Sequence, residues 1–249
     1  MNGRVAQIWR YPIKAHGCEA LQQVELSKGQ TMPWDRHWAV AHEHSEADGR
    51  EWVPCANFSR GAKAPSLMAL KARLDERTQR ITLTHPDLQP LSFLPDGDET
   101  GFLEWIRKIM PETRAASARI IRVPGRGLTD TAFPSISLNS LTTLDALSSA
   151  AGHTLSPLRW RGNIWFEGLP AWQEFDWIDK RLRIGTAELV VRERITRCRA
   201  TMANPENGIC DTDTLALIEK NWGHKDFGIY GEIITDGCVS VGDKLEVLQ

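Results

Sequence analysis

The feature that most constrains the fold of this chain is the way that turn residues break its apolar stretches into short runs. Most runs are only six to ten residues long and end at Gly, Pro or Asp. Short runs of this kind predict β-strands. Strands are expected at 4–10, 20–26, 36–41, 80–85, 118–123, 159–166, 180–202 (with a hairpin turn at Gly185), 227–235 and 239–248.

Three stretches instead have apolar residues at helical spacing, at 100–110, 137–151 and 211–223. In the second of these, Ser137 or Asn139 is the expected N-cap and Gly152 ends the helix. Asp236-Gly237 is a hairpin dipeptide between the last two strands. Strands and helices do not alternate strictly. The expected fold is therefore mixed but mainly β, a β-barrel with peripheral helices.

A change in composition near 111–126 predicts two domains, 1–117 and 118–249. The first is expected to be a β-barrel-like extension, and the second to be the barrel that carries the peripheral helices. The 249 residues are enough for two domains of ordinary size.

The charge balance excludes several classes of partner. The chain has 30 basic and 32 acidic residues, whereas a nucleic-acid-binding or membrane-surface protein has a strong basic excess. No apolar run approaches the roughly 20 residues that span a bilayer, and the N-terminus has no apolar signal segment. We therefore expect a cytoplasmic protein with no membrane span and no nucleic-acid partner.

The five cysteines do not form a recognised metal or disulfide framework. They stand at 18, 55, 198, 210 and 238, with no C-x-x-C pair and no iron–sulfur spacing. The pair His42-x-His44 precedes a polar Asp-Gly turn, which is more typical of an exposed hairpin tip than of a metal site. The ten tryptophans are interpreted mainly as core residues.

One cysteine has an unusual neighbourhood. In "TRCRATMANPENG" (196–208), Cys198 lies between Arg197 and Arg199, shortly before an Asn/Pro/Gly turn. Strand alternation would place Thr196 and Cys198 on one face and both arginines on the other. Nearby cations favour the thiolate, which is the form that acts as a nucleophile or a metal ligand. The alternative interpretation is a small buried apolar residue.

Seven segments taken together make the chain similar to a known family. They are "YPIKAHG" (11–17), "WDRHWAV" (34–40), "LTDTAFPSISLNSL" (128–141), "RWRGNIWFEG" (159–168), "QEFDW" (173–177), "RITRCRATMANPENG" (194–208) and "FGIYGEIITDGCVSVGDKLEVL" (227–248). In this order they resemble the motifs of MOSC-domain proteins, the family named after the C-terminal domain of molybdenum cofactor sulfurase. The resemblance is to the subset with an N-terminal MOSC β-barrel extension, which includes the mitochondrial amidoxime-reducing component and bacterial relatives.

The resemblance implies a molybdenum cofactor, Mo-molybdopterin, whose metal is bound by Cys198. A thiolate suits this metal, and arginines provide planar donors for phosphate and pterin. The residues that the family motifs imply for the cofactor are Lys14 and Arg36 at the phosphate end, Arg161 and Asn163 at pterin or phosphate, Thr196 and Arg197 on the approach to the metal, and Asp130 and Tyr230 nearby. Cys198 and Asp130 are the residues expected to take part in catalysis.

Three positions depart from the family pattern. Ala15 replaces a common serine after the motif lysine, which removes one hydroxyl donor from the expected site. Asn204 stands where many members have aspartate, and Asn207 stands where serine or threonine is usual before Gly208. Because asparagine is suited to turns, the last two changes are expected to preserve the turn.

The resemblance implies an oxidoreductase that reduces N-hydroxylated substrates such as amidoximes, N-hydroxylated bases and hydroxylamines. The sequence has neither a dinucleotide glycine fingerprint nor iron–sulfur cysteines, so electrons must come from a separate ferredoxin-like or cytochrome-type donor. The same motifs also fit a cofactor carrier, or a sulfur-transfer protein with a persulfide on Cys198. A member that folds but binds nothing is a third alternative. A bare and a nucleotide-extended molybdopterin remain equally open.

Overall fold

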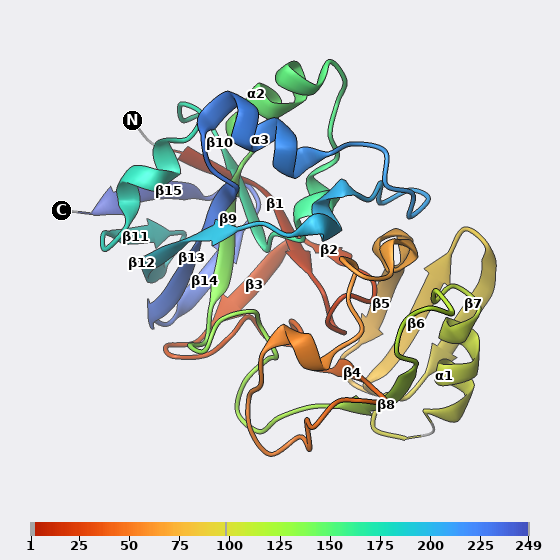
Figure 1. Ribbon diagram of the computed structural model, residues 1–249. Helices are drawn as coiled ribbons and strands as arrows, with labels where there is room; N and C mark the ends of the chain where they lie inside the picture. The colour runs from red at the N-terminus through yellow and green to blue at the C-terminus, as the bar shows by residue number, and fades with distance from the viewer. Residues whose placement is uncertain (1–2, 98, 249) are drawn as a thin grey trace.

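The centre of the molecule is a closed β-barrel. The computed structural model describes residues 3–97 and 99–248, and Figure 1 shows the barrel with helices α2 and α3 above it. Seven strands form the ring: β1 (Gly3–Arg10), β9 (Ile136–Ser140), β10 (Ile164–Glu167), β11 (Arg181–Ile184), β12 (Ala187–Thr196), β13 (Asp226–Thr235) and β15 (Lys244–Leu248). The mainly β fold with a barrel and outer helices is thereby confirmed.

The first strand closes this ring. The barrel strands pair in the order β10-β9-β13-β12-β11-β15-β1, and β1 pairs with β10 again on its other side. The pairs are antiparallel apart from β9 and β10, which run parallel. Strand β1 also pairs at its end with β2 (Glu19–Leu21), through which the chain leaves the barrel. The N-terminal strand is thus a structural part of the C-terminal barrel.

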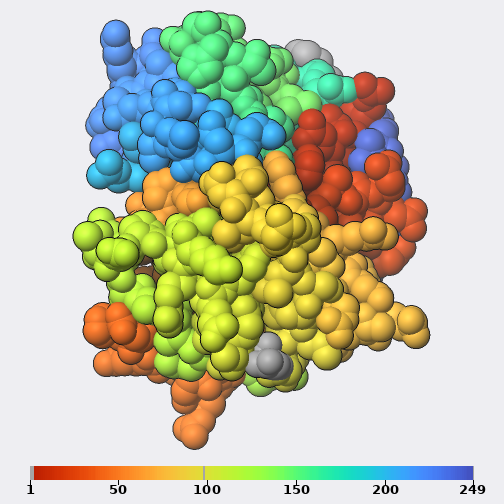
Figure 2. All heavy atoms as spheres, turned by 90° about the vertical axis from the view of Figure 1, so that its right-hand side faces the viewer, coloured from red at the N-terminus to blue at the C-terminus, as the bar shows by residue number. Residues whose placement is uncertain are grey.

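A second body lies beside the barrel, at the lower right of Figure 1. It contains β4 (Ala39–His42) paired with β8 (Ser117–Ile121), the meander β5 (Lys71–Asp75), β6 (Arg80–His85) and β7 (Leu88–Phe93), and helix α1 (Thr100–Arg107). Strand β3 (Gln23–Leu26) pairs with β14 (Gly237–Ser240) against the barrel. Figure 2 shows the meander and α1 region, in yellow and yellow-green, packed directly beneath the blue C-terminal residues.

Short 3-10 helices connect these elements. They are η1 (Cys55–Asn57), η2 (Pro65–Ala69), η3 (Pro157–Trp160), η4 (Gln173–Trp177) and η5 (Arg199–Met202). Each body has its own apolar core. The barrel core includes Val5, Leu138 and Ile229, and the core of the second body includes Trp38 and Phe102.

The two long C-terminal helices end as expected but begin later. Helix α2 (Leu141–Ala151) is capped by Ser140 rather than by Ser137 or Asn139, and its C-cap Gly152 has φ +75°. Helix α3 (Thr214–Trp222) is capped by Asp213 and followed by Gly223 at φ +76°. Residues 137–140 are strand because they pair with β10 and β13, and this tertiary pairing overrides their helical spacing.

Three other local predictions were wrong. The expected strand 159–166 begins with η3, and strand proper starts only at Ile164. The long strand expected to reach residue 202 ends at Thr196. Asp236-Gly237 does not join two paired strands, because β14 pairs with β3 instead of β13. Within residues 3–97 and 99–248, no helix is long and apolar enough to cross a membrane.

A buried glutamate in the shell of the barrel carries a pH-dependent prediction. Glu174 of η4 is fully buried and accepts a hydrogen bond from Thr143 Oγ1 at 2.8 Å. Burial raises its pKa from 4.5 to about 7. A carboxyl group whose pKa is raised by folding stabilises the folded state most at pH values below its pKa in the unfolded chain. This stabilisation is lost as the pH rises through its pKa in the folded protein. The free energy of unfolding should therefore fall by about 3 kcal/mol between pH 4 and pH 8 on account of this group.

The variant Glu174→Gln removes the charge and keeps the shape. Its free energy of unfolding is expected to exceed that of the wild type by up to about 3 kcal/mol at pH 8, but to differ by less than about 1 kcal/mol at pH 5. Urea unfolding at both pH values measures the difference. The exposed Glu104→Gln is the matched control, with changes below about 0.5 kcal/mol. An equal effect of Glu174→Gln at both pH values would contradict the assignment.

Candidate functional site

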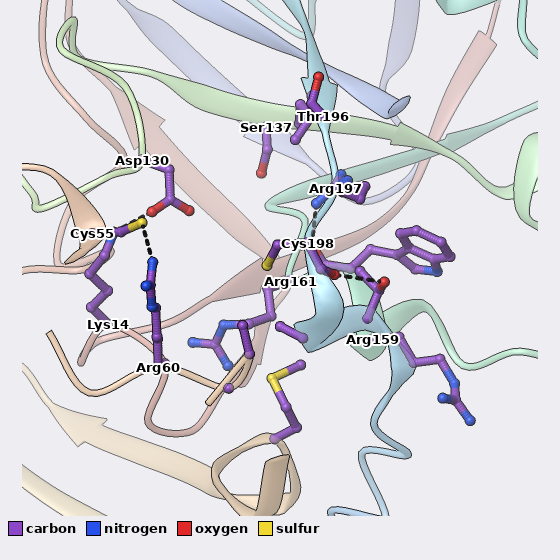
Figure 3. A pocket seen from close by; sticks show the side chains of 18 of the residues that line it. Lys14, Cys55, Arg60, Asp130, Ser137, Arg159, Arg161, Thr196, Arg197 and Cys198 are labelled. Atoms are coloured by element: carbon purple, nitrogen blue, oxygen red, sulfur yellow. Dashed lines mark hydrogen bonds and ion pairs between the residues drawn. The ribbon is translucent and has the colours of Figure 1, made fainter. Parts of the chain in front are cut away.

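A cavity of about 270 Å³ lies where the barrel meets the second body. Eight of the nine residues expected from the sequence line it: Lys14, Arg36, Asp130, Arg161, Thr196, Arg197, Cys198 and Tyr230. They come from β12, from β13 and from the segments that follow β1, β3, β8, η3 and β12, so the fold brings together residues that are far apart in the chain. Figure 3 shows many of them around Cys198.

The ninth residue, Asn163, supports the cavity wall from behind. It is 2% exposed, and its Oδ1 accepts hydrogen bonds from the backbone N–H and the hydroxyl of Ser137. The same oxygen lies 3.4 Å from a guanidinium nitrogen of Arg36. Asn163 lines only a small adjoining hollow of about 10 Å³. Its place in the structure is therefore to position Arg36 and β9.

Cys198 stands at the exposed end of a strand, where the chain turns. Strand β12 ends at Thr196, and Cys198 is the N-cap residue of η5. Its side chain is exposed, and its sulfur points into the cavity (Figure 3). Because strand geometry has ended, the expected alternation of faces does not hold. Arg199 lines a different hollow beside α3, so only one of the two flanking arginines reaches the cavity.

Three hydrogen bonds hold Arg197 next to Cys198. Its three guanidinium nitrogens donate at 2.7 Å to the carbonyls of Phe227 and Trp160 and to Oδ1 of Asn139. The guanidinium also lies over the rings of Trp160 and Phe227. Burial lowers the pKa of Arg197 to about 10. This arrangement presents a fixed cation in a site of low dielectric constant.

Asn139 can hold Arg197 only because two glycines leave room for it. A Cβ on Gly162 would lie 1.9 Å from Nδ2 of Asn139, and a Cβ on Gly228 would lie 2.2 Å from its Oδ1. Gly228 also has φ +77°, which disfavours any side chain. The "RWRGN" segment therefore needs glycine at position 162, because a larger residue there would displace the Asn139 amide that binds Arg197.

Arg36 and Arg161 share an aromatic ring. Their guanidiniums lie 4.7 and 4.3 Å from the centroid of the buried Tyr11. Arg36 pairs with the buried Asp35 and donates to the carbonyl of Arg161 at 2.8 Å. Burial alone would lower the pKa of Arg36, but the charge and hydrogen bond of Asp35 raise it. Burial lowers the pKa of Arg161, which makes no ion pair within the described part of the chain.

Three residues at this end of the cavity have strained backbone. Ala15, Arg36 and Arg161 have φ values of 63°, 49° and 50°, in the left-handed region. Non-glycine residues held there cost about 1–3 kcal/mol each, and such strain gathers at binding sites. The strain allows the two guanidiniums to converge on one ring.

Lys14 and Asp130 form a charged pair near Arg36. Lys14 Nζ donates to Asp130 Oδ1 at 2.5 Å and to the carbonyl of Leu128 at 2.7 Å. Burial would raise the pKa of Asp130, but the charge and hydrogen bond of Lys14, with Arg36 and Arg161 further away, lower it. Asp130 is therefore ionised at neutral pH. The hydroxyl of Thr196 is occupied differently, donating to Asp226 at 2.6 Å.

Sequence reasoning missed several residues of the cavity wall. Arg159 is the first arginine of "RWRGN", and it donates to the carbonyl of Met202 and to Asp211. Asp211 also accepts from Nδ2 of Asn204, so an aspartate at 204 would place two carboxylates together. The turn after Cys198 is thus fastened to η3. Cys55 and Arg60 line the cavity from the second body, and no motif or residue spacing in the sequence around them predicts this.

The charge balance of the cavity favours an anionic ligand. Lys14, Arg36 and Arg159 are paired with carboxylates, whereas Arg161, Arg197 and Arg60 form no ion pair with any residue of 3–97 or 99–248. These three arginines are half-buried, and an anion in the cavity would compensate for the partial loss of their hydration. In the same part of the chain, no three His, Cys, Asp or Glu side chains are grouped as metal ligands.

Two family models match the sequence. The MOSC domain matches residues 131–246, and the MOSC N-terminal beta barrel domain matches residues 2–102. The domain boundary predicted at 117/118 falls between the two matched ranges and stays a prediction. Strand β8 begins at that boundary and pairs with β4.

Comparison with known proteins gives one full-length curated relative. The chain is 23% identical over 297 residues to mitochondrial amidoxime-reducing component 1 of Mus musculus, covering 99% of this chain and 82% of that protein. Among solved structures, the YUAD protein of Bacillus subtilis has a TM-score of 0.51 and 13% identity, covering 99% of this chain and 96% of its own. YiiM of Geobacillus stearothermophilus has a TM-score of 0.36 and 17% identity, and the match covers 46% of this chain and 54% of that one.

Proposed function

This chain belongs to the MOSC-domain proteins with an N-terminal β-barrel domain, and we propose that it is a molybdenum-cofactor-dependent oxidoreductase. Its substrates would be N-hydroxylated compounds such as amidoximes, N-hydroxylated bases and hydroxylamines. The observation that carries the proposal is the exposed thiol of Cys198, which opens into a cavity where the half-buried Arg161 and Arg197 form no ion pair with any residue of 3–97 or 99–248.

The residues present fit this cofactor. Cys198 offers the soft ligand that molybdenum requires, and its carbonyl accepts from Thr201, which holds the turn in place. Arg161 and Arg197 offer fixed donors for phosphate and pterin oxygens. Lys14 and Arg36 complete the cationic end, as the motif match predicts. The cofactor, when bound, would supply the redox chemistry that reduces the N–OH group.

The chain itself supplies binding, orientation and protons. Reduction of N–OH to N–H releases water and consumes two electrons and two protons. In this proposal Asp130, which is ionised at neutral pH and accepts a hydrogen bond from Lys14, is the acid–base residue that relays protons from solvent to the site. The electrons would come from a separate ferredoxin-like or cytochrome-type protein, as proposed from the sequence. A cytoplasmic location belongs to the same proposal.

Metal analysis combined with an activity assay tests the function. Protein expressed in a molybdate-supplied host should contain about one molybdenum per chain and should reduce benzamidoxime or an N-hydroxylated purine with reduced methyl viologen. Stoichiometric metal without turnover would instead indicate a cofactor carrier. A persulfide on Cys198 without molybdenum would indicate sulfur transfer. Protein with neither metal nor persulfide from such a host would refute all these functions.

A further inference from the structure

One unpaired guanidinium in the cavity is not among the residues that the motifs assign to the cofactor. Arg60 lines the cavity from the second body, across from the arginines of the barrel. Its only side-chain hydrogen bond within residues 3–97 and 99–248 goes to Sγ of Cys55, at 3.2 Å. A thiol sulfur is a weak acceptor, and a guanidinium has five N–H donors. Most of the N–H donors of Arg60 therefore have no protein acceptor among the described residues.

The backbone around Arg60 holds this side chain at the site. The carbonyl of Arg60 accepts from the backbone N–H groups of Lys63 and Ala64, both at 3.0 Å. The next residue, Gly61, has no side chain, and a Cβ there would lie 2.6 Å from Sδ of Met68 and 3.4 Å from Cβ of Ala200. Ala200 is two residues beyond Cys198. The Arg60 segment is thus packed against the turn that carries the proposed metal ligand.

The neighbours of Arg60 in the cavity form an apolar wall. Gly61, Ala62 and Met68 line the cavity beside it, and Ala200 faces them from the barrel. Methionine adapts its shape to apolar ligands of differing outline. Figure 3 shows Arg60 and Cys55 on one side of Cys198 and Arg159 on the other. This wall combines a single cation with an apolar surface next to the reacting centre.

We propose that Arg60 is a specificity-determining residue that binds a carboxylate of the substrate, so that acidic N-hydroxylated compounds are preferred over neutral ones. The inference rests on the proposed function and deepens it. The guanidinium would bind the carboxylate in the bidentate geometry that arginine favours, and Met68 would contact the apolar part of the molecule. The arginines on the opposite wall, Arg161 and Arg197, remain with the cofactor.

Steady-state kinetics of the molybdenum-loaded protein test the inference. The probes are benzamidoxime and 4-carboxybenzamidoxime, which differ only in the carboxylate. The wild type should have the lower KM for the carboxylated compound. Arg60→Met should raise that KM about tenfold to a hundredfold, the range for a lost hydrogen bond to a charged group, with kcat and the KM for benzamidoxime unchanged. Arg60→Lys, which keeps the charge but not the fork, should lie between the two.

The controls separate this inference from the proposed function. Lys63→Met removes an exposed cation three residues away, which is not part of the cavity, and should change neither KM. Calorimetric titration of 4-carboxybenzamidoxime into wild type and Arg60→Met measures binding even if no compound is turned over. Failure of the wild type to reduce either probe, with binding still dependent on Arg60, would refute the function and keep the subsite. Equal binding of both probes by wild type and Arg60→Met, or loss of molybdenum from Arg60→Met, would overturn the inference.

Discussion

Replacement of Cys198 by alanine is expected to reduce the molybdenum content of the purified protein to background while the fold persists. Cys198 is the ligand proposed for the metal, and residues 3–97 and 99–248 contain no group of three or more His, Cys, Asp or Glu side chains that could hold the metal in its place. Without Cys198 the cofactor would keep its contacts to the arginines but lose its covalent anchor. Because the side chain is exposed, the free energy of unfolding should change by less than about 0.5 kcal/mol.

Elemental analysis and urea unfolding of the same preparations measure both effects. Cys210→Ala is a matched control, because Cys210 is also exposed and lies 12 residues further along but outside the cavity. That variant should keep its molybdenum and its activity. Wild-type levels of molybdenum in Cys198→Ala would refute the assignment of the ligand, and with it the proposed reaction.

The second large effect is expected from Gly162→Ala, which should both destabilise the fold and weaken cofactor binding. The added Cβ would lie 1.9 Å from Nδ2 of the fully buried Asn139 and 3.2 Å from Nε1 of Trp165. Neither neighbour can move freely, since Asn139 is also confined by Gly228. Overpacking of this kind costs about 1–3 kcal/mol. The displaced amide would release Arg197, so molybdenum content should fall as well.

Gly101→Ala provides the matched control for this variant. Gly101 lies in helix α1, and a Cβ there would meet nothing within 4 Å. Alanine at this position should stabilise the protein by about 0.5–1 kcal/mol, because glycine disfavours helix. Urea unfolding of both variants gives the comparison. A Gly162→Ala protein as stable as the wild type, with full molybdenum content, would mean that Asn139 does not position Arg197.

Much of the site could be predicted because its residues lie in recognisable motifs. Lys14, Arg36, Arg161 and Cys198 are far apart in the chain, yet all line one cavity. The helix ends could also be predicted from glycines, because Gly152 and Gly223 follow their helices in the left-handed conformation. These features depend on local chemistry, which a sequence displays directly.

Other features depend on packing between distant segments, and these were missed. Leu138 continues a helical spacing, but its segment is held as a strand between β10 and β13. Arg60 and Cys55 reach the cavity only because the second body packs on the barrel, and no spacing around them predicts it. Arg197 and Arg199 were wrongly expected to share one face, because a strand was extended past its true end at Thr196.

The way β1 completes the barrel determines when this protein can become functional during its synthesis. β1 is made first and β15 last, and the two pair side by side, with Gly3 opposite Leu245. Until β15 leaves the ribosome, β1 has an unpaired edge, which is prone to associate with other chains. Such distant pairing also slows folding. Closure of the barrel, and with it any binding of the proposed cofactor, must therefore wait until β15 has been made, and a fragment that begins after β1 would have an open barrel.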